Sequence, residues 1–396
     1  MSKLSPVSIG VSSSAEALTA GQAAAHMAIK RLPGRQIQGA LVFGSSWFHQ
    51  ARLLEGIRSV LGPVPLVGGS TAGEITPDGP KSHSCVVVAL ADETMSVGVG
   101  LGADVTRNPR LAGYSAAHQA IQQFNGHPRS GFVIFADGLS TGYAEVLRGI
   151  QEVLGTGSLV TGALMADDLR FVRTYQYAAD RPVSQAVVGL LLGGAWKLGV
   201  GLEHGFAPIS KPRRITRARA TILYELDGQP ASAVYEEYFG SSIVETIRRA
   251  GFSRQLIAYP LGIQLEMPGQ FLLRNIIACA DDGSLVCTGE MTEGSWVQLM
   301  IGSKELALNA ARLAAERAIQ HLQTVHFVLV FDSVARKQLL GHEAAQELHI
   351  LRQTIGPSVP LAGCYTYGEQ APLGSPYSYG RSSVQTGAIL VIAVGQ

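Results

Sequence analysis

The apolar and polar positions of this chain follow one pattern three times. Each copy has an apolar strand, a helical stretch, a second apolar strand and a glycine-rich turn that a carboxylate closes. The copies span residues 39–74, 131–167 and 326–369, and the closing carboxylates are Glu74, Asp167 and Glu369. Phe43 and Phe135, in the first strands, lie 92 residues apart, and the first two closing carboxylates lie 93 apart. This regularity indicates an internally repeated fold.

A helix is predicted before each copy, over residues 14–30, 109–124 and 304–322. In the last of these, apolar residues recur at helical spacing and give one apolar stripe: Leu306, Ala310, Leu313, Ala314 and Ala318. A strand–helix–strand crossover forces the two strands to pair in parallel within one sheet, with helices covering it. We therefore expect an α/β (mixed α+β) fold, in which repeated strand–helix–strand units form mixed sheets covered by helices.

Two hairpins are predicted after the first two turns. Their arms are residues 85–90 with 95–101, and residues 186–192 with 196–202. The second arms match closely, since Gly-Val-Gly occurs at 98–100 and again at 199–201. The first two copies, at about 1–105 and 106–205, are therefore expected to build one N-terminal domain.

The pattern changes between residues 204 and 227. A basic stretch at 211–219 leads into a linking strand at 220–226, and residues 227–230 (Asp-Gly-Gln-Pro) have the composition of a turn before a helix. We place a domain boundary there, which gives an N-terminal domain of residues 1–226 and a C-terminal domain of residues 227–396. The second domain is expected to add its own strands to the third copy, at 270–280, 286–289 and 386–394.

Composition narrows the class of protein. The chain has 31 Lys and Arg residues against 30 Asp and Glu residues, a net charge of +1, and only 15% charged residues. This balance removes the electrostatic basis of a nucleic-acid binder or a polybasic membrane-surface protein. No apolar run reaches the roughly 18 residues of a membrane span, and the N-terminus lacks the apolar region of a signal peptide. Four scattered cysteines without CxxC spacing suit a reducing compartment, so a soluble cytoplasmic protein is expected.

The glycine-rich turns are the first candidates for chemistry, because ligand sites of doubly wound sheets lie at the carboxyl ends of the strands. In the first turn, glycines let backbone amides approach a ligand, and Ser70, Thr71 and Glu74 offer polar groups. The alternative is a tight turn that needs positive φ angles, and both interpretations stay open. The second turn, with Ala-Leu-Met at 163–165, has lost most polar groups and is interpreted as structural.

The third turn favours a site more strongly. Cys364, Tyr365, Tyr367 and Glu369 place two aromatic rings beside a thiol and a carboxylate, a combination that can wall a pocket. Cys364 is a nucleophile only if a histidine lies near it in space; otherwise it is a small buried thiol. The sequence contains no P-loop, GxGxxG turn, GxSxG elbow or HExxH motif. An enzyme is therefore not predicted.

His204 is the candidate metal ligand. It follows the second Gly-Val-Gly strand, where the first copy has Ala103. A neutral imidazole is a common axial ligand of haem iron, and the alternative is a hydrogen-bonded histidine at a strand end. Arg213 and Arg214 could pair with haem propionates or lie on a solvated edge strand. Three later residues either close a pocket or pack on a loop: Tyr377, Tyr379 and Arg381.

Four segments resemble those of the FIST family, and they occur in the family's order. They are residues 68–74 (Gly-Gly-Ser-Thr-Ala-Gly-Glu), 205–209 (Gly-Phe-Ala-Pro-Ile), 226–231 (Leu-Asp-Gly-Gln-Pro-Ala) and 363–369 (Gly-Cys-Tyr-Thr-Tyr-Gly-Glu). The resemblance covers nearly the whole chain, with both the FIST N and the FIST C halves. It implies a sensory input module of bacterial signal transduction that binds a small ligand. The chain departs from the family at residues 377–383 (Tyr-Ser-Tyr-Gly-Arg-Ser-Ser), where members often carry an Asn-containing stretch.

The resemblance also implies a specific ligand, because some stand-alone FIST members are haem proteins that sense nitric oxide and act on a partner histidine kinase or cyclic-di-GMP enzyme. The first hypothesis is therefore a stand-alone FIST sensor that holds haem b with His204 as the iron ligand. The residues expected around this haem are Arg213, Arg214, Tyr365 and Tyr367.

Two further hypotheses stay open. The second is a haem-free sensor that holds an amino-acid-like metabolite with the polar residues of the turns: Ser70, Thr71, Glu74, Cys364 and Glu369. The third is an enzyme with Cys364 as its nucleophile. Neither nucleic acid nor a membrane is a partner in any of the three, and a homo-oligomer is compatible with each.

Overall fold

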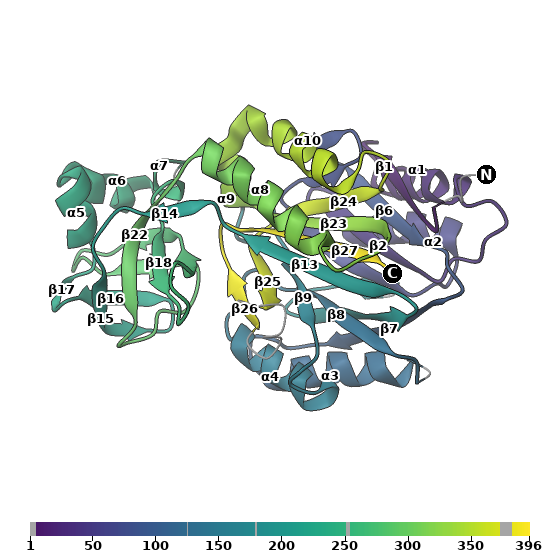
Figure 1. Cartoon of the computed structure of the whole chain (residues 1–396), viewed down its shortest axis with the longest axis horizontal. Coiled ribbons are helices and arrows are strands. Elements are labelled where there is room, and N and C mark those ends of the chain that lie inside the picture. Colours follow the sequence, from purple (N-terminus) through teal and green to yellow (C-terminus); the bar gives the residue numbers. More distant parts are fainter. Residues whose placement is uncertain (1–4, 125, 179, 251–253, 373–381) are drawn as a thin grey trace.

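The computed structural model describes residues 5–124, 126–178, 180–250, 254–372 and 382–396. It is a mixed α+β protein with two parts (Figure 1). The larger part, called the body below, contains the three repeats, and the smaller part, called the lobe, contains residues 206–302 and lies at the left of Figure 1. Within the described residues, no helix is long and apolar enough to cross a membrane.

The three repeats share one order of elements: strand, helix, strand, helix, strand, short hairpin and closing strand. The first repeat comprises β1 (Val7–Ser12), α1 (Ala17–Lys30), β2 (Gly39–Ser45), α2 (Gln50–Leu61), β3 (Leu66–Thr71), β4 (Glu74–Thr76), β5 (Gly79–Lys81) and β6 (Cys85–Leu90). The second comprises β7 (Met95–Gly102), α3 (Pro109–Gln122), β8 (Arg129–Ala136), α4 (Tyr143–Leu154), β9 (Val160–Leu164), β10 (Gln176–Ala178), β11 (Arg181–Val183) and β12 (Val187–Gly194). The third comprises β13 (Lys197–Glu203), α8 (Lys304–Ile319), β23 (Val325–Ser333), α9 (Val334–Leu340), a 3-10 turn (Gly341–Glu343), α10 (Ala344–Ile355), β24 (Leu361–Thr366), β25 (Gly368–Pro372), β26 (Ser382–Gln385) and β27 (Ile389–Gly395).

Each repeat forms a six-stranded sheet that borrows its hairpin from another repeat. The hairpin β4–β5 joins the sheet of the third repeat, β10–β11 joins that of the first, and β25–β26 joins that of the second. Because each repeat gives one hairpin and receives one, the exchange closes a ring of three sheets. Between the sheets, the buried rings of Phe43, Phe135 and Phe331 contact one another with centroids 5.7, 5.8 and 6.0 Å apart.

Glycines on the first strand of a repeat allow its helix to pack closely. A Cβ added at Gly100 on β7 would lie 1.8 Å from the carbonyl oxygen of Ala116 on α3. A Cβ at Gly201 on β13 would lie 1.9 Å from the carbonyl oxygen of Ala314 on α8. The repeated Gly-Val-Gly sequence is therefore a signature of strand-to-helix packing.

The two predicted hairpins are wrong, because their arms belong to different repeats. β6 pairs with β1 and β2, whereas β7 pairs with β12 and β8 lies on the other side of β12. The second predicted hairpin fails in the same way, because β13 pairs with β27 and not with β12. The Gly-Val-Gly strands thus open the second and third repeats instead of closing the first and second, and their similarity reflects equivalent helix-packing positions.

The third repeat belongs to the same body as the first two. Its first strand, β13, precedes the lobe and its other elements follow it, so the lobe is an insertion within this repeat. The expected boundary between residues 226 and 227 lies inside the lobe. Sequence spacing cannot show this arrangement, because β13 pairs with β27 at the far end of the chain.

The lobe has its own sheet, helices and core. It comprises β14 (Phe206–Pro208), β15 (Arg213–Arg219), β16 (Ile222–Leu226), β17 (Gln229–Pro230), α5 (Ala233–Phe239), α6 (Ser242–Ala250), α7 (Arg254–Ile257), β18 (Leu261–Gln264), β19 (Phe271–Arg274), β20 (Ile276–Cys279), β21 (Leu285–Cys287) and β22 (Trp296–Gly302). Its buried core includes Ile215, Leu223, Tyr235, Ile247 and Leu299. Strand β19 and the segment after β21 face the body, where they meet β26 and the start of α4.

Helix starts differ in how they are capped. Ser303 accepts a hydrogen bond from the backbone of Leu306 and so caps α8. Helix α4 instead begins after Gly142, whose φ of 82° is left-handed and whose missing side chain leaves the helix without a side-chain cap. Its first amides are therefore available to another partner.

Candidate functional site

The closing glutamates of the first and third turns occupy equivalent, fully buried positions. Glu74 accepts hydrogen bonds from the Thr71 hydroxyl and from the backbone N–H and hydroxyl of Ser84, the last two at 3.0 and 2.6 Å. Glu369 accepts from the Thr366 hydroxyl at 2.7 Å and from the backbone N–H of Ala388 at 3.1 Å. Burial raises the pKa of Glu74 to about 7 and that of Glu369 to about 8.

The other polar groups predicted in these turns are also used within the protein. The Ser70 hydroxyl donates to the Ala166 carbonyl at 2.8 Å and accepts from the backbone N–H of Tyr175 at 2.9 Å. Cys364 lies opposite Glu74 in the β24–β4 ladder and is fully buried, which raises the pKa of its thiol. The structure thus brings Thr71, Glu74 and Cys364 together, but in a place where they hold the turns and have no exposed surface.

The second turn departs from this arrangement. Gly68, Gly162 and Gly363 occupy one equivalent position, since a Cβ on each would strike the carbonyl oxygen of the neighbouring parallel strand at 1.7 to 2.0 Å. Glu74 and Glu369 each lie six residues after this glycine. In the second copy the residue at that distance is Asp168, not Asp167. Position 165 is methionine where the other copies have Thr71 and Thr366, so the threonine–glutamate pair is missing.

In place of that pair the second repeat has a distinctive loop, residues 167–173. The fully buried Asp167 carboxylate accepts hydrogen bonds from the backbone N–H groups of Phe171, Val172 and Arg173 at 2.8 to 3.0 Å. Three non-glycine residues of the loop have left-handed backbones, with φ of 57°, 62° and 53°: Asp168, Leu169 and Phe171. Such conformations cost about 1–3 kcal/mol each and cluster at functional segments.

Tyr367 joins this loop to the third turn. Its hydroxyl donates to the Asp167 carboxylate and accepts from the backbone N–H of Leu169 at 2.8 Å. Its ring stacks on Phe171 with centroids 5.1 Å apart. Tyr365, in contrast, is buried on the other side of β24, where the ammonium of Lys337 lies 4.6 Å from its ring centroid.

A cavity of about 150 Å³ lies between the body and the lobe. Its walls combine hydroxyl groups, the start of α4 and one buried arginine. From the body they include Ser140, Thr141, Gly142, Tyr143, Tyr367 and Thr386, and from the lobe Thr221, Arg274, Thr288 and Glu290. It is called the Arg274 cavity below.

Arg274, at the end of β19, is only 7% exposed and has no carboxylate within ion-pair distance among the described residues. Its Nε donates to the Glu290 carbonyl at 3.2 Å, and its Nη1 donates to the carbonyls of Leu273 and Val384 at 2.8 and 3.4 Å. Within the described chain Nη2 makes no hydrogen bond. Burial lowers the pKa of Arg274 to about 10, so the group stays charged at neutral pH. The cavity therefore holds a buried cation that forms no direct ion pair among the described residues, and the nearest protein counter-charge is the exposed Glu290.

Further hydrogen-bond donors face the same space. Tyr143 also lines the cavity, but its hydroxyl oxygen is fully buried. Thr141 and Thr221 add hydroxyls, and the uncapped start of α4 adds backbone amides at the positive end of a helix dipole. Glu290, which is exposed on the rim, is the one lining residue with a carboxylate among those that the structure describes. The chemistry of this set suits an anion.

Comparison with protein-family models identifies the family to which this chain belongs. Residues 38–229 match the FIST N domain and residues 231–372 match the FIST C domain. The chain belongs to the FIST family. FIST domains indicate a sensory signalling domain, and the Arg274 cavity is formed by residues from both matched segments.

Several curated proteins are related to this FIST protein. It is 28% identical to an uncharacterized protein of Methanocaldococcus jannaschii over 161 residues, which are 38% of this chain and 31% of that protein. It is 27% identical to an uncharacterized protein of Mycobacterium tuberculosis over 224 residues, which are 54% of this chain and 55% of that protein. The chain thus spans between about a third and about half of the length of these relatives.

Among solved structures, the FIST chain is similar to a cyanuric acid hydrolase from A. caulinodans. The TM-score is 0.40 at 8% identity, over 98% of this chain and 99% of that one. A second cyanuric acid hydrolase structure gives 0.39 at 9% identity. A likeness this distant says nothing about the chemistry of the FIST chain.

The residues predicted to hold haem do not fit that group. His204 lines a cleft of about 620 Å³, but its Nδ1 accepts a hydrogen bond from the backbone N–H of Phe206 at 3.0 Å. Burial lowers the pKa of His204 to about 4, so the ring is neutral and carries its proton on Nε2. Iron ligation through Nε2 needs the opposite tautomer, with Nδ1 as donor.

The other expected haem contacts lie apart from His204. Arg213 pairs with Asp227 at 3.5 Å and with Glu237, while Arg214 is exposed. Tyr365 and Tyr367 lie at the β24 turn, and only Tyr367 lines the Arg274 cavity. Tyr377, Tyr379 and Arg381 lie outside the described residues.

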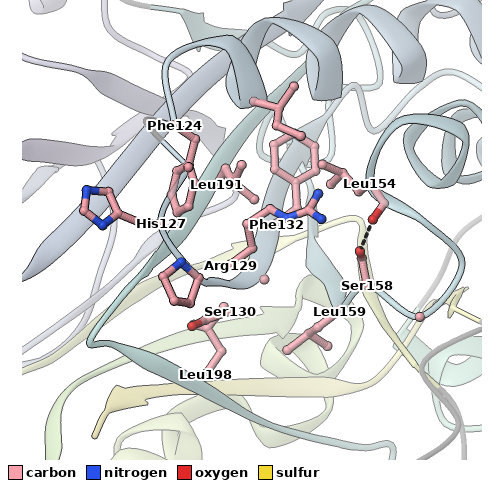
Figure 2. A pocket seen from close by; sticks show the side chains of 15 residues that line it. Phe124, His127, Arg129, Ser130, Phe132, Leu154, Ser158, Leu159, Leu191 and Leu198 are labelled. Atoms are coloured by element: carbon pink, nitrogen blue, oxygen red, sulfur yellow. Dashed lines mark hydrogen bonds between the residues drawn. The ribbon is translucent and has the colours of Figure 1, made fainter.

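A third crevice, of about 760 Å³, lies at the amino end of β8 (Figure 2). Figure 2 shows Arg129 among the apolar side chains of Phe124, Phe132 and Leu154. Arg129 is exposed, so water solvates its charge. This distinguishes it from Arg274, whose charge is buried.

Two residues that line the Arg274 cavity are not among those predicted from the sequence: Arg274 and Tyr143. One signal was available for the first: Arg274 interrupts the apolar run Phe-Leu-Leu-Arg-Asn-Ile-Ile at 271–277. A charge inside a buried strand is unusual, which makes its position a candidate for a site. Tyr143 gave no such signal, because a tyrosine after glycine at a helix start is ordinary.

Proposed function

We propose that this FIST protein is a sensory module that binds a small anionic metabolite in the Arg274 cavity and passes the signal to a separate protein. The observation that carries the proposal is the buried guanidinium of Arg274, which faces the cavity without a carboxylate partner. A buried charge is costly unless it is paired, and backbone carbonyls satisfy only Nε and Nη1 of Arg274. An anionic ligand bound to Nη2 would offset this cost.

The donor set defines the ligand's chemistry. Nη2 of Arg274, the hydroxyls of Thr141 and Thr221 and the amides at the start of α4 are donors, and an anionic head group accepts from all of them. A carboxylate or a phosphate has this property. The cavity of about 150 Å³ suits a molecule of metabolite size and is well below the roughly 300–1,000 Å³ of drug-sized sites.

This proposal develops the haem-free hypothesis but moves the site. Glu74, Glu369, Ser70, Thr71 and Cys364 support the turns, and the ligand contacts come from the lobe and from α4. Haem b and nitric oxide have no observation in their favour. The recipient of the signal is proposed to be a signalling protein such as a histidine kinase or a cyclic-di-GMP enzyme, on the strength of the sensory role of FIST domains alone.

The position of the cavity supports a sensory role. Its walls come from the body and from the inserted lobe, so a ligand bound there contacts both parts at once. A ligand that binds one relative arrangement more tightly than another shifts the population towards it. Binding between two parts is a direct way to convert occupancy into a change that a partner protein detects.

The proposal is tested by thermal unfolding and calorimetry with inorganic phosphate, acetate, succinate and glutamate. We expect at least one of these anions to bind the wild-type protein and to raise its unfolding temperature. Arg274→Gln should weaken that binding by about 2 kcal/mol or more, which is roughly 30-fold in Kd.

Two further variants serve as controls. Arg129→Gln removes an exposed arginine from the other crevice and should bind as the wild type does. Arg274→Lys keeps a positive charge and should retain part of the affinity, which separates a charge requirement from misfolding. Equal binding by wild type and Arg274→Gln, with both folded by circular dichroism, would overturn the proposal.

A further inference from the structure

Loop 167–173 is the place where the second repeat breaks the symmetry of the body. In the first and third repeats, the segment after the turn forms a strand, β4 or β25, that enters a neighbouring sheet at once. In the second repeat the corresponding strand, β10, begins only at Gln176, and residues 167–173 intervene. An insertion of left-handed, non-glycine residues in one copy of three is not required by the shared fold.

The loop carries exposed apolar side chains on the surface. Phe171 is 48% exposed and Val172 is 79% exposed, and beside them Trp47 is 61% exposed. Arg170 lies over the Trp47 ring at 5.2 Å, and its guanidinium also donates to the Ser46 carbonyl at 3.2 Å. Together, Trp47 and residues 170–172 form an aromatic and arginine-containing surface, the composition found at interaction hot spots.

Tyr367 is the residue that the loop and the Arg274 cavity share. It lines the cavity, and its hydroxyl and ring make the contacts with Asp167, Leu169 and Phe171 described above. The phenol has a single proton to donate. In the ligand-free protein that proton goes to the Asp167 carboxylate.

We propose that Tyr367 couples occupancy of the Arg274 cavity to the conformation of loop 167–173, an inference that rests on the proposed function. An anion in the cavity is a second negatively charged acceptor for the same phenol proton. When the phenol turns to the ligand, Asp167 loses one donor, the backbone N–H of Leu169 loses its acceptor, and Phe171 loses its stacking partner. The left-handed backbone of the loop is then less restrained, and the surface of Trp47 and residues 170–172 rearranges.

The first arm of the test uses ligand-free protein. Hydrogen exchange of peptides that cover residues 167–173 is compared among wild type, Tyr367→Phe and Tyr365→Phe. Tyr367→Phe should raise the exchange of the Leu169 amide at least tenfold. Tyr365→Phe is the matched control, because the Tyr365 hydroxyl has no partner among the described residues, and it should leave the loop unchanged. Equal loop exchange in wild type and Tyr367→Phe overturns the inference whatever the ligand is.

The second arm adds inorganic phosphate, and separately succinate, at saturation. We expect protection of the cavity segments around residues 140–147 and 271–277 and faster exchange in the loop, with the loop response absent in Tyr367→Phe. Cavity protection with an unchanged or slowed loop overturns the coupling and leaves the proposed function intact. The proposed function itself is overturned if neither phosphate nor succinate protects the cavity segments and if acetate and glutamate do not protect them either.

Discussion

The hydroxyl of Tyr367 donates a hydrogen bond to the carboxylate of Asp167, which lies 200 residues earlier in the chain. The bond joins the third repeat to loop 167–173 of the second repeat. Asp167 is fully buried, and three backbone amides share its charge with the phenol. This carboxylate therefore holds the loop together from its centre.

Replacement of Asp167 should destabilise the protein. Asp167→Ala leaves several buried donors without an acceptor, and hydrogen bonds to charged groups contribute about 1.5–3 kcal/mol each. We expect a loss of about 3 kcal/mol in the free energy of unfolding, measured by urea denaturation. Asp78→Ala, at an exposed position, is the control and should change stability by less than about 0.5 kcal/mol. Equal effects of the two substitutions would contradict the role given to Asp167.

The buried glutamates predict a pH dependence of stability. In the folded protein the pKa is about 7 for Glu74 and about 8 for Glu369, whereas the ordinary value is 4.5. At these two positions the folded protein thus binds more protons than the unfolded chain between about pH 4.5 and pH 8, and the lowered pKa of His204 opposes this only in part. The free energy of unfolding should therefore fall as the pH rises through that window.

Glutamine at both positions tests this dependence directly. Glu74→Gln with Glu369→Gln removes both titrating groups, so the decline in stability between pH 5 and pH 8 should become shallower. Denaturant midpoints across this range provide the measurement. A slope equal to that of the wild type would show that other groups cause the decline.

Glycines on the first strands should be intolerant of a side chain. Gly201→Ala places a Cβ about 1.9 Å from a helix carbonyl, so α8 must shift away from β13. We expect a loss of roughly 1–3 kcal/mol, the usual cost of overpacking. Gly157→Ala, where an added Cβ meets nothing within 4 Å, is the matched control and should be neutral. A neutral Gly201→Ala would argue against the close packing of α8 on β13.

His204 should not act as a haem ligand. Purified protein incubated with haem is expected to show no Soret band that depends on this residue, because Nδ1 of the ring is already an acceptor for Phe206. Absorption spectra of wild type and His204→Ala, taken after gel filtration, should be the same. A stoichiometric Soret band in the wild type that shifts in the variant would restore the haem hypothesis.

The repeated unit can be predicted from the sequence, but the pairing of strands between repeats cannot. The apolar runs around Phe43, Phe135 and Phe331 identify equivalent core strands. The apolar stripe predicted for residues 304–322 is confirmed only in part, because the buried face of α8 consists of alanines and Leu306 is exposed. The exchange of hairpins among repeats leaves no local signal, because the pairing of Glu74 with Cys364 or of Glu369 with Ala163 joins segments far apart in the chain.

The polar residues predicted as ligand contacts lie inside the turns. Ser70, Thr71 and Glu369 suggested ligand contacts, yet buried turns need internal acceptors and donors, and these residues supply them. The second copy, which has fewer polar groups in its turn, is the one whose loop departs from the shared fold. The cavity around Arg274 could not be predicted from the sequence, because its other lining residues come from six separate segments of the chain.

The most direct test of the account is the binding of inorganic phosphate and small carboxylates to wild type, Arg274→Gln and Arg129→Gln by isothermal titration calorimetry. The account predicts that at least one anion binds wild type and Arg129→Gln with equal affinity and binds Arg274→Gln at least 30-fold more weakly. Equal affinity in all three folded proteins, or no binding of any anion to the wild type, would contradict it.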